Sequence, residues 1–163
     1  MLIAALALAA QPCPATPLVP PATMAAWSAT PASMIAAADP DDRRIMPLPI
    51  GRRVTVKLLS VDSVDFAVAP QGKAPGREGG LLLLEAPAPG RYRVLLSAAA
   101  WIDVIGPGGP VASIGHGHGP ECAGIRKAVE FALEAGRYTV QLSGAQAGTI
   151  GVMVAAAEGG ESQ

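Results

Sequence analysis

Hydrophobic and polar residues alternate with a period of two through most of the chain after Gly51. Such alternation places apolar side chains on one face of a β-strand and polar side chains on the other. The sequence GRYRVLLS at Gly90–Ser97 recurs as GRYTVQLS at Gly136–Ser143. A turn glycine, a tyrosine and alternating apolar positions are typical of a strand that follows a tight turn. The repeat therefore predicts a β-sandwich built from similar hairpin units.

Nine segments carry a strand pattern, and turns rich in glycine and proline separate many of them. These segments are Arg53–Leu59, Val64–Ala69, Leu81–Glu85, Arg91–Leu96, Trp101–Ile105, Val111–Ile114, Ile125–Leu133, Tyr138–Leu142 and Thr149–Val154. We expect an all-β fold, a two-sheet sandwich or jelly roll of about nine short antiparallel strands. The two repeated strands should hold comparable places, with Val94 and Val140 pointing the same way relative to the core.

The region before the sandwich has a different composition. Residues 11–50 are rich in proline and alanine, which excludes a long helix and favours an extended N-terminal arm. Within it, Ala22–Ser28 has room for one or two helical turns, and we expect Trp27 to fill a core position. The sandwich domain is predicted over residues 51–155. A small, polar and flexible tail is predicted at residues 156–163.

The first residues suggest export. Residues 1–38 contain no charged side chain, and residues 1–10 read MLIAALALAA. An apolar run that ends in small residues is typical of a cleaved signal peptide. The run is shorter than the roughly 20 residues that a membrane helix needs. We therefore expect a periplasmic or secreted protein whose mature chain has no integral membrane segment.

The two cysteines of the chain, Cys13 and Cys122, both follow this signal peptide. Two cysteines in an exported domain are more often paired than free. A Cys13–Cys122 disulfide would attach the proline-rich arm to the loop before Ile125.

Composition narrows the classes of partner. A chain of 163 residues has room for one domain with a sizeable core. Charged residues make up 15% of the sequence, and the formal net charge is −1. A nucleic-acid partner is not expected, because no basic stripe is present to neutralise phosphates.

Both histidines, His116 and His118, lie in the segment IGHGHGPEC, which ends at Cys122. Alternating histidines can bring two imidazoles to one metal ion, and Glu121 would be a third ligand for Cu, Zn or Fe. The order of these residues is similar to the first metal motif of cupin dioxygenases. Here, however, Glu121 comes too early and the distant histidine of that family is missing.

The alternative interpretation of this segment is a glycine-rich connection held by hydrogen bonds, and we favour it. A disulfide would remove the Cys122 sulfur as a ligand, and the flanking glycines leave the segment without a preformed site. No cofactor is expected on this interpretation.

No complete catalytic set is predicted. Ser113 or Ser97 with His116 and Asp103 has the residue types of a hydrolase triad, but no G-x-S-x-G turn surrounds either serine. Asp103 alternates with Ile102 within its strand, so we expect it to face solvent.

Two cations follow the histidine segment. Arg126 and Lys127 would form surface ion pairs with Asp103 or Glu121 across strands, each contributing less than ~1 kcal/mol. Together with Asp103 they mark a candidate surface site.

The phrase L-x-x-G-x-Y-x-V-x-L-S, at Leu133–Ser143 and loosely at Leu84–Ser97, resembles strands of bacterial pre-peptidase C-terminal domains. The resemblance covers about Gly51–Ala155. It implies a secreted β-sandwich of the kind that accompanies hydrolases and binds surfaces or sugars. The acidic metal-binding loops of some members are missing here.

Three functions remain open from the sequence. The first is a non-enzymatic binding or accessory module of the bacterial envelope, with a protein or saccharide partner. The second is a periplasmic metal-binding protein that uses His116 and His118, with a cupin-like dioxygenase as its enzymatic form. The third is a structural role in an envelope complex.

Overall fold

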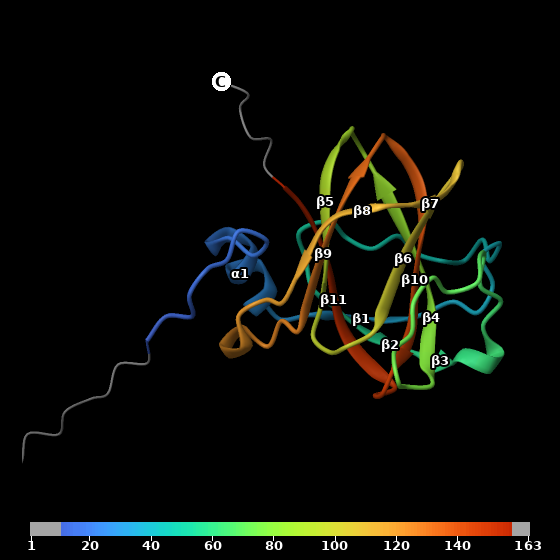
Figure 1. The fold of residues 1–163 in the computed structure, drawn as a ribbon, viewed down its shortest axis with the longest axis horizontal. Helices are drawn as coiled ribbons and strands as arrows, with labels where there is room; N and C mark the ends of the chain where they lie inside the picture. The colour runs from blue at the N-terminus through green and yellow to red at the C-terminus, as the bar shows by residue number, and fades with distance from the viewer. Residues whose placement is uncertain (1–10, 158–163) are drawn as a thin grey trace, which may run out of the picture.

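Two β-sheets packed face to face dominate a computed structural model, which describes residues 11–157 (Figure 1). This confirms the predicted all-β sandwich, with eleven strands in the described part instead of about nine. The predicted signal peptide at residues 1–10 lies outside the described residues, as does most of the predicted tail.

The larger sheet has six strands in the order β1-β2-β11-β5-β9-β8. In this order the strands are Ala32–Ile35, Val54–Lys57, Thr149–Ala156, Gly90–Leu96, Lys127–Leu133 and Ser113–Gly117. The smaller sheet has the order β3-β4-β10-β6-β7. Its strands are Leu59–Ser60, Glu78–Ala86, Gly136–Ala145, Trp101–Gly106 and Gly109–Val111. β1 and β2 are parallel, whereas the other paired strands are antiparallel.

The repeated sequence contributes one central strand to each sheet, β5 to the larger and β10 to the smaller. Val94 of β5 and Val140 of β10 are both fully buried in the core between the sheets. Val129, Phe131 and Leu133 of β9 also enter this core, which explains the alternation of the β9 sequence. The predicted equivalence of the two repeated strands is confirmed.

Both tyrosines of the repeat form the same hydrogen bond. The Tyr92 hydroxyl donates to the carbonyl of Ala88 over 2.7 Å, and the Tyr138 hydroxyl donates to that of Glu134 over 3.0 Å. Each bond reaches back four residues to the turn before the strand, as in the tyrosine corner of other sandwiches.

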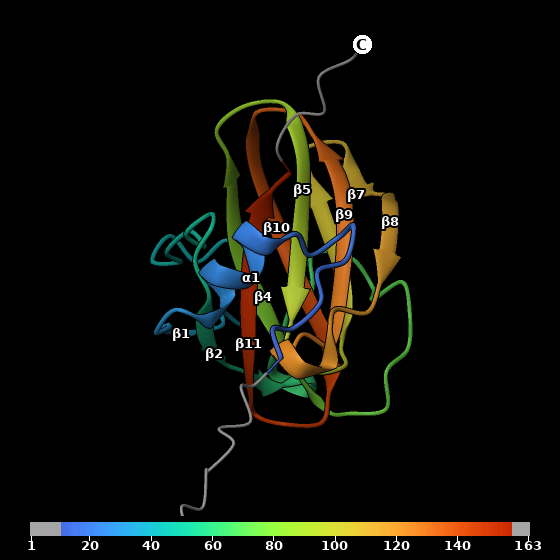
Figure 2. The ribbon, with the colours of Figure 1, turned by 90° about the vertical axis from the view of Figure 1, so that its left-hand side faces the viewer.

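The N-terminal arm covers the outer face of the larger sheet, where the short helix α1 (Pro21–Ser28) crosses β11 and β5 (Figure 2). Trp27 is 1% exposed and packs with Leu95 and Met153 in a second, smaller core. Its indole nitrogen donates to the carbonyl of Ala123 over 2.9 Å. The expectation of a buried Trp27 is confirmed. No helix of residues 11–157 is both long and apolar enough to cross a membrane.

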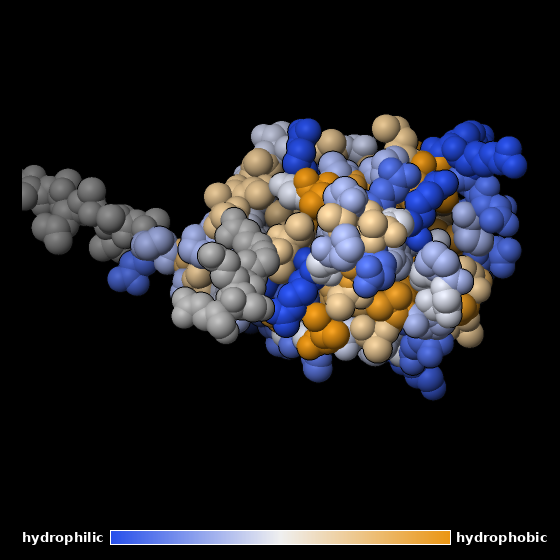
Figure 3. Space-filling view, turned by 90° about the horizontal axis from the view of Figure 1, so that it is seen from above, coloured by the Kyte–Doolittle hydropathy of each residue, from blue (hydrophilic) through white to orange (hydrophobic). Residues whose placement is uncertain are grey.

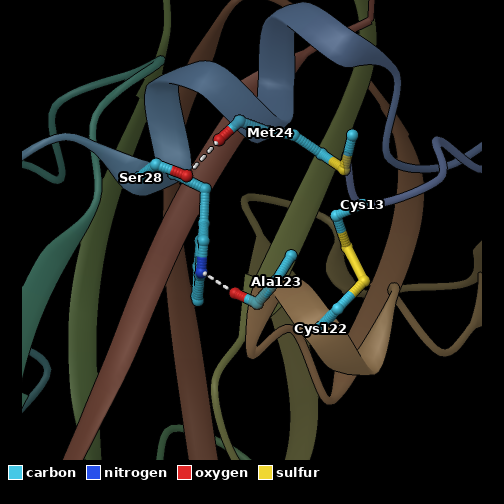
Figure 4. The surroundings of a disulfide bond; sticks show 6 residues. Cys13, Met24, Ser28, Cys122 and Ala123 are labelled. Carbon is cyan, nitrogen blue, oxygen red and sulfur yellow. Dashed lines mark hydrogen bonds between the residues drawn. A yellow bond between two sulfur atoms is a disulfide. The ribbon is translucent and has the colours of Figure 1, made fainter. Parts of the chain in front are cut away.

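A disulfide joins Cys13 of the arm to Cys122, as the sequence predicts. Cys122 lies in η2 (Glu121–Ala123), a short 3-10 helix. Figure 4 shows the disulfide near Met24 of α1, beside the hydrogen bond that the Ala123 carbonyl accepts. The arm is thus held by one covalent bond and by a buried indole.

The arm also closes one side of the sandwich. Its strand β1 pairs with β2 of the larger sheet, and the chain then crosses to the smaller sheet. There the amide of Ala37 donates to Leu81 over 2.8 Å, and the amide of Leu48 donates to Leu83 over 2.8 Å. The predicted arm is therefore partly built into the sandwich edge.

The predicted strand Val64–Ala69 is wrong. This segment is a loop, and it crosses the outer face of the smaller sheet. Its Val68 amide donates to the Gln141 side chain over 3.2 Å, and its carbonyl accepts from the same side chain over 3.1 Å. The Gln141 side chain satisfies both the N–H and the C=O group of Val68. The segment therefore needs no neighbouring strand, although its sequence alternates.

Candidate functional site

A cleft of about 510 Å³ lies on the side of the sandwich opposite β1, between β6 and β7 of one sheet and β8 and β9 of the other. Its walls combine apolar core residues with a few polar side chains. The apolar residues are Trp101, Ile102, Val104, Pro110, Val111, Ala112, Val129 and Phe131, and the polar ones are Gln71, Asp103, Ser113, His116 and Lys127. An apolar concavity with a few polar groups is the usual form of a ligand site.

The cleft exists because β7 is short. β7 pairs with Val104–Gly106, the second half of β6, and then the chain crosses at Ala112 to β8 in the other sheet. The first half, Trp101–Asp103, has β10 on one side and no strand on the other. The cleft therefore occupies a vacant half-strand position at the open side of the sandwich.

Lys127 reaches into the cleft from β9. Its ammonium group donates to the carbonyl of Ala100 over 2.8 Å and lies 4.9 Å from the ring centroid of Trp101. Burial lowers the pKa of Lys127 below its ordinary value of 10.5, and the charge of Asp103 partly opposes this shift. Lys127 makes no ion pair within 4.0 Å with any acidic residue of the described chain, so the predicted cross-strand ion pair is not formed.

Asp103 does not face solvent, and that prediction is wrong. It is 7% exposed on the outer face of β6, because the loop before β4 covers this face. The Trp101 indole donates to one carboxylate oxygen over 2.9 Å, and the backbone N–H of Gln71 donates to the other over 3.1 Å. These two donors offset the cost of burying the carboxylate.

The Trp101 indole forms part of the cleft wall. The loop backbone lies directly against it, since a Cβ built at Gly72 would be 2.2 Å from the ring. The ammonium group of Lys127 also lies over the ring. The indole therefore holds the loop and Lys127 in place.

A second depression of about 350 Å³ adjoins the cleft and shares Trp101, His116 and Lys127 with it. It adds Lys73 and Arg126 to the lining. Neither Arg126 nor Lys73 takes part in an ion pair within the described chain. Asp103 is the one carboxylate among the lining residues, so cations predominate here although the whole chain has a net charge of −1.

The candidate metal ligands are distributed over three neighbouring depressions. His116, an exposed residue of β8, lines the cleft and shares the adjoining depression of about 350 Å³ with His118, whereas His118 and Glu121 line another depression of about 380 Å³. The Nδ1 atom of His118 is 2.9 Å from the Arg126 carbonyl. Across residues 11–157, no three His, Cys, Asp or Glu side chains gather as a metal site would require. The sulfur of Cys122 is held in the disulfide.

The triad residue types also remain unconnected. Ser113 and His116 line the cleft with Asp103, but the Asp103 carboxylate already accepts two hydrogen bonds from other groups. Ser97 lies elsewhere, where its hydroxyl accepts from the amide of Gly151 over 2.7 Å. No hydrogen bond therefore links either serine to a histidine and a carboxylate among the described residues.

Sequence reasoning missed the burial of Glu130, which is 4% exposed on the outer face of β9. Arg93 approaches its carboxylate to 2.6 Å and Arg91 to 3.3 Å. Burying this charge is tolerated because both arginines on the neighbouring strand β5 pair with it. The sequence does contain a signal for this contact, because one predicted strand carries the acidic residue and another carries the two basic residues that face it.

Exposed hydrophobic side chains offer no competing surface. The large ones are Ile35 and Met46 near the closed side, each 71% exposed, and Ile114 beside the cleft. On the end of the molecule seen in Figure 3, hydrophobic residues stand in small groups among hydrophilic ones. These side chains therefore mark no second candidate site among the described residues, although larger depressions of about 670 and 830 Å³ border the arm.

Comparisons with protein-family models, curated proteins and solved structures found no match for this chain. The resemblance to pre-peptidase C-terminal domains remains an expectation from the sequence.

Proposed function

We propose that this protein is a non-enzymatic binding module whose ligand site is the cleft between β6 and β8. The observation that supports this most is the vacant half-strand position at the open side of the sandwich. The apolar side chains of the cleft provide contact area for a ligand, and the cationic side chains of the cleft and the adjoining depression orient the ligand. On the opposite side the arm crosses from sheet to sheet, through the pairing of β1 with β2 and the hydrogen bonds of Ala37 and Leu48 to β4.

The proposal places the protein in the bacterial envelope. The Cys13–Cys122 disulfide supports an oxidising compartment, since cytosolic thiols are kept reduced. The apolar run at residues 1–10 supports export to the periplasm or beyond. The partner would be a protein segment or a saccharide presented there.

A cleft-filling variant tests the proposal. Ala112 is an exposed residue that lines the cleft, so Ala112→Trp should fill the opening while leaving the core unchanged. Ala147 is exposed in the turn before β11, which makes Ala147→Trp a matched control. Both variants and the native protein are applied to arrays of peptides and of saccharides.

We expect at least one ligand class that binds the native protein and Ala147→Trp but not Ala112→Trp. Ligands that bind Ala112→Trp equally well would contradict the cleft as the site. Zinc titration of the same samples tests the metal alternative. Stoichiometric binding tighter than about micromolar, roughly −8 kcal/mol, that His116→Ala and His118→Ala each abolish would favour a metal-binding protein instead.

A further inference from the structure

We infer that the ligand of the cleft is an extended acidic segment of another polypeptide, which pairs with the free edge of β6 and places a carboxylate beside Lys127. This inference rests on the proposed binding function. It adds the class of ligand and the way in which the ligand binds.

The backbone of β6 provides the first argument. Trp101–Asp103 pair with β10 on one side, while β7 ends at Val111 opposite Val104. On the other side no backbone hydrogen bond from the described residues reaches this half of β6. A strand directs N–H and C=O groups to both of its sides, so this edge has unpaired groups that a peptide strand can satisfy.

The length of the free edge limits the ligand. Three residues at about 3.4 Å each span about 10 Å, which suits three or four residues of an extended peptide. Alternate side chains of that peptide would face the apolar floor formed by Val129 and Phe131. The remaining side chains would face outward, so the segment should alternate between apolar and polar residues.

Charge provides the second argument. Lys127 lies where β6 begins, and Lys73 and Arg126 line the adjoining depression. The Asp103 carboxylate is buried, with one hydrogen bond to each oxygen, so its charge is less accessible to a ligand than the cations of the lining. Lys127 uses one donor for the Ala100 carbonyl and retains others. A carboxylate is therefore favoured over a cation at this end of the cleft.

An anionic saccharide would satisfy the charges but not the strand edge. Its ring hydroxyls cannot reproduce the regular spacing of N–H and C=O groups along a strand. The free edge of β6 thus favours a peptide, and a saccharide becomes an alternative outcome of the test.

The test uses blocked pentapeptide libraries in which one position is fixed as Glu, Gln or Lys and the others are randomised. Binding to the isotope-labelled full chain is followed by NMR at the amides of Trp101–Asp103 and at the Trp101 indole. We expect the Glu libraries to shift these signals, the Gln libraries to bind roughly tenfold more weakly, and the Lys libraries to have no effect.

The best single Glu peptide is then N-methylated at one or the other set of alternate amides. Strand pairing requires one set only, so one methylated peptide should lose binding and the other should retain it. This comparison needs no variant of the protein. Lys127→Gln should remove the preference for Glu over Gln, whereas Arg137→Gln, an exposed substitution outside the cleft lining, should preserve it.

Equal binding of Glu and Gln peptides, or of both methylated peptides, would overturn the inference. Oligogalacturonate is titrated in parallel. If it shifts the cleft signals and no peptide does, the proposed binding function stands and the peptide inference fails. If neither class shifts them, both fail.

Discussion

The backbone of the loop before β4 lies against the indole of Trp101 at Gly72, where a side chain would have no room. The neighbouring residue, Gln71, supplies the amide that covers Asp103. The missing side chain at Gly72 therefore lets the loop pack against Trp101 and lets the Gln71 backbone N–H reach the Asp103 carboxylate.

Gly72→Ala should lower the free energy of unfolding by about 1–3 kcal/mol, because its Cβ would lie 2.2 Å from the Trp101 ring. Urea unfolding measures the loss. The control is Gly108→Ala, since no atom lies within 4 Å of a Cβ at Gly108. That control should stay within about 0.5 kcal/mol of the native protein. Equal losses from both substitutions would contradict the packing of the loop on Trp101.

The stability of the protein should depend on the ionisation of Lys127. Burial lowers its pKa, so the folded protein binds fewer protons than the unfolded chain between that lowered pKa and 10.5. The free energy of unfolding therefore rises with pH through this window, and the penalty from the charged form is fully present below it.

Urea unfolding at a series of alkaline pH values can show this effect as a difference between proteins. Relative to Lys127→Gln, the native protein should gain stability as the pH rises toward 10.5. Lys57→Gln, at an exposed position of β2, controls for the loss of a positive charge. A difference between native protein and Lys127→Gln that does not change with pH would show that burial does not perturb this ammonium group.

The polar residues of the cleft were only partly predictable. Alternation correctly placed Asp103 on the face opposite Ile102, but it could not show that a loop distant in sequence covers that face. The pairing of Cys13 with Cys122 followed from their number and from the predicted export of the chain. The cleft itself lies between two sheets, so its position depends on how the sheets pack and could not be predicted from local sequence patterns.

At the scale of elements, the repeated strands β5 and β10 contribute the same three features to opposite sheets. Each has a turn glycine, an inward valine and a tyrosine whose hydroxyl returns to the turn. Because the two hydrogen bonds are alike in span, their contributions to stability should be alike as well.

Tyr92→Phe and Tyr138→Phe should each lower the free energy of unfolding by about 0.5–1.5 kcal/mol, the usual net value of one hydrogen bond. The phenyl ring preserves the packing in the core, so the loss reports the hydroxyl alone. Chemical denaturation of both single variants gives the comparison. A large loss in one and none in the other would show that the two corners are not equivalent.

The elements that sequence reasoning missed share a cause. β1 lies in an Ala-rich segment without clear alternation, and it forms because β2 lies parallel beside it. Val64–Ala69 has alternation but no strand partner, and it became a loop. Pairing partners distant in sequence decided both cases, whereas tight turns and alternation sufficed for most of the central strands.

At the scale of the molecule, the arm is an outer layer that depends on one covalent bond and one small core. The Cys13–Cys122 disulfide closes a loop with a sequence separation of 109 residues. Trp27 and the residues around it provide the remaining attachment.

The double variant Cys13→Ser/Cys122→Ser should lower the free energy of unfolding by up to about 4–5 kcal/mol, the entropy of closing so long a loop. Its folded core should keep the native circular dichroism spectrum, since both sheets are paired without the disulfide. Native protein treated with reductant should match the variant. A loss below about 1 kcal/mol would mean that the Trp27 core alone holds the arm.

The same bond determines how the molecule responds to mechanical force. When residues 11 and 157 are pulled apart, tension passes from Cys13 directly to Cys122, and the chain between them carries no load. Only the segment after Cys122, which contains β9, β10 and β11, can then extend. Reduction should release a further 109 residues, or about 380 Å of contour at roughly 3.5 Å per residue. In a single-molecule stretching experiment, this additional contour length should appear only when reductant is present.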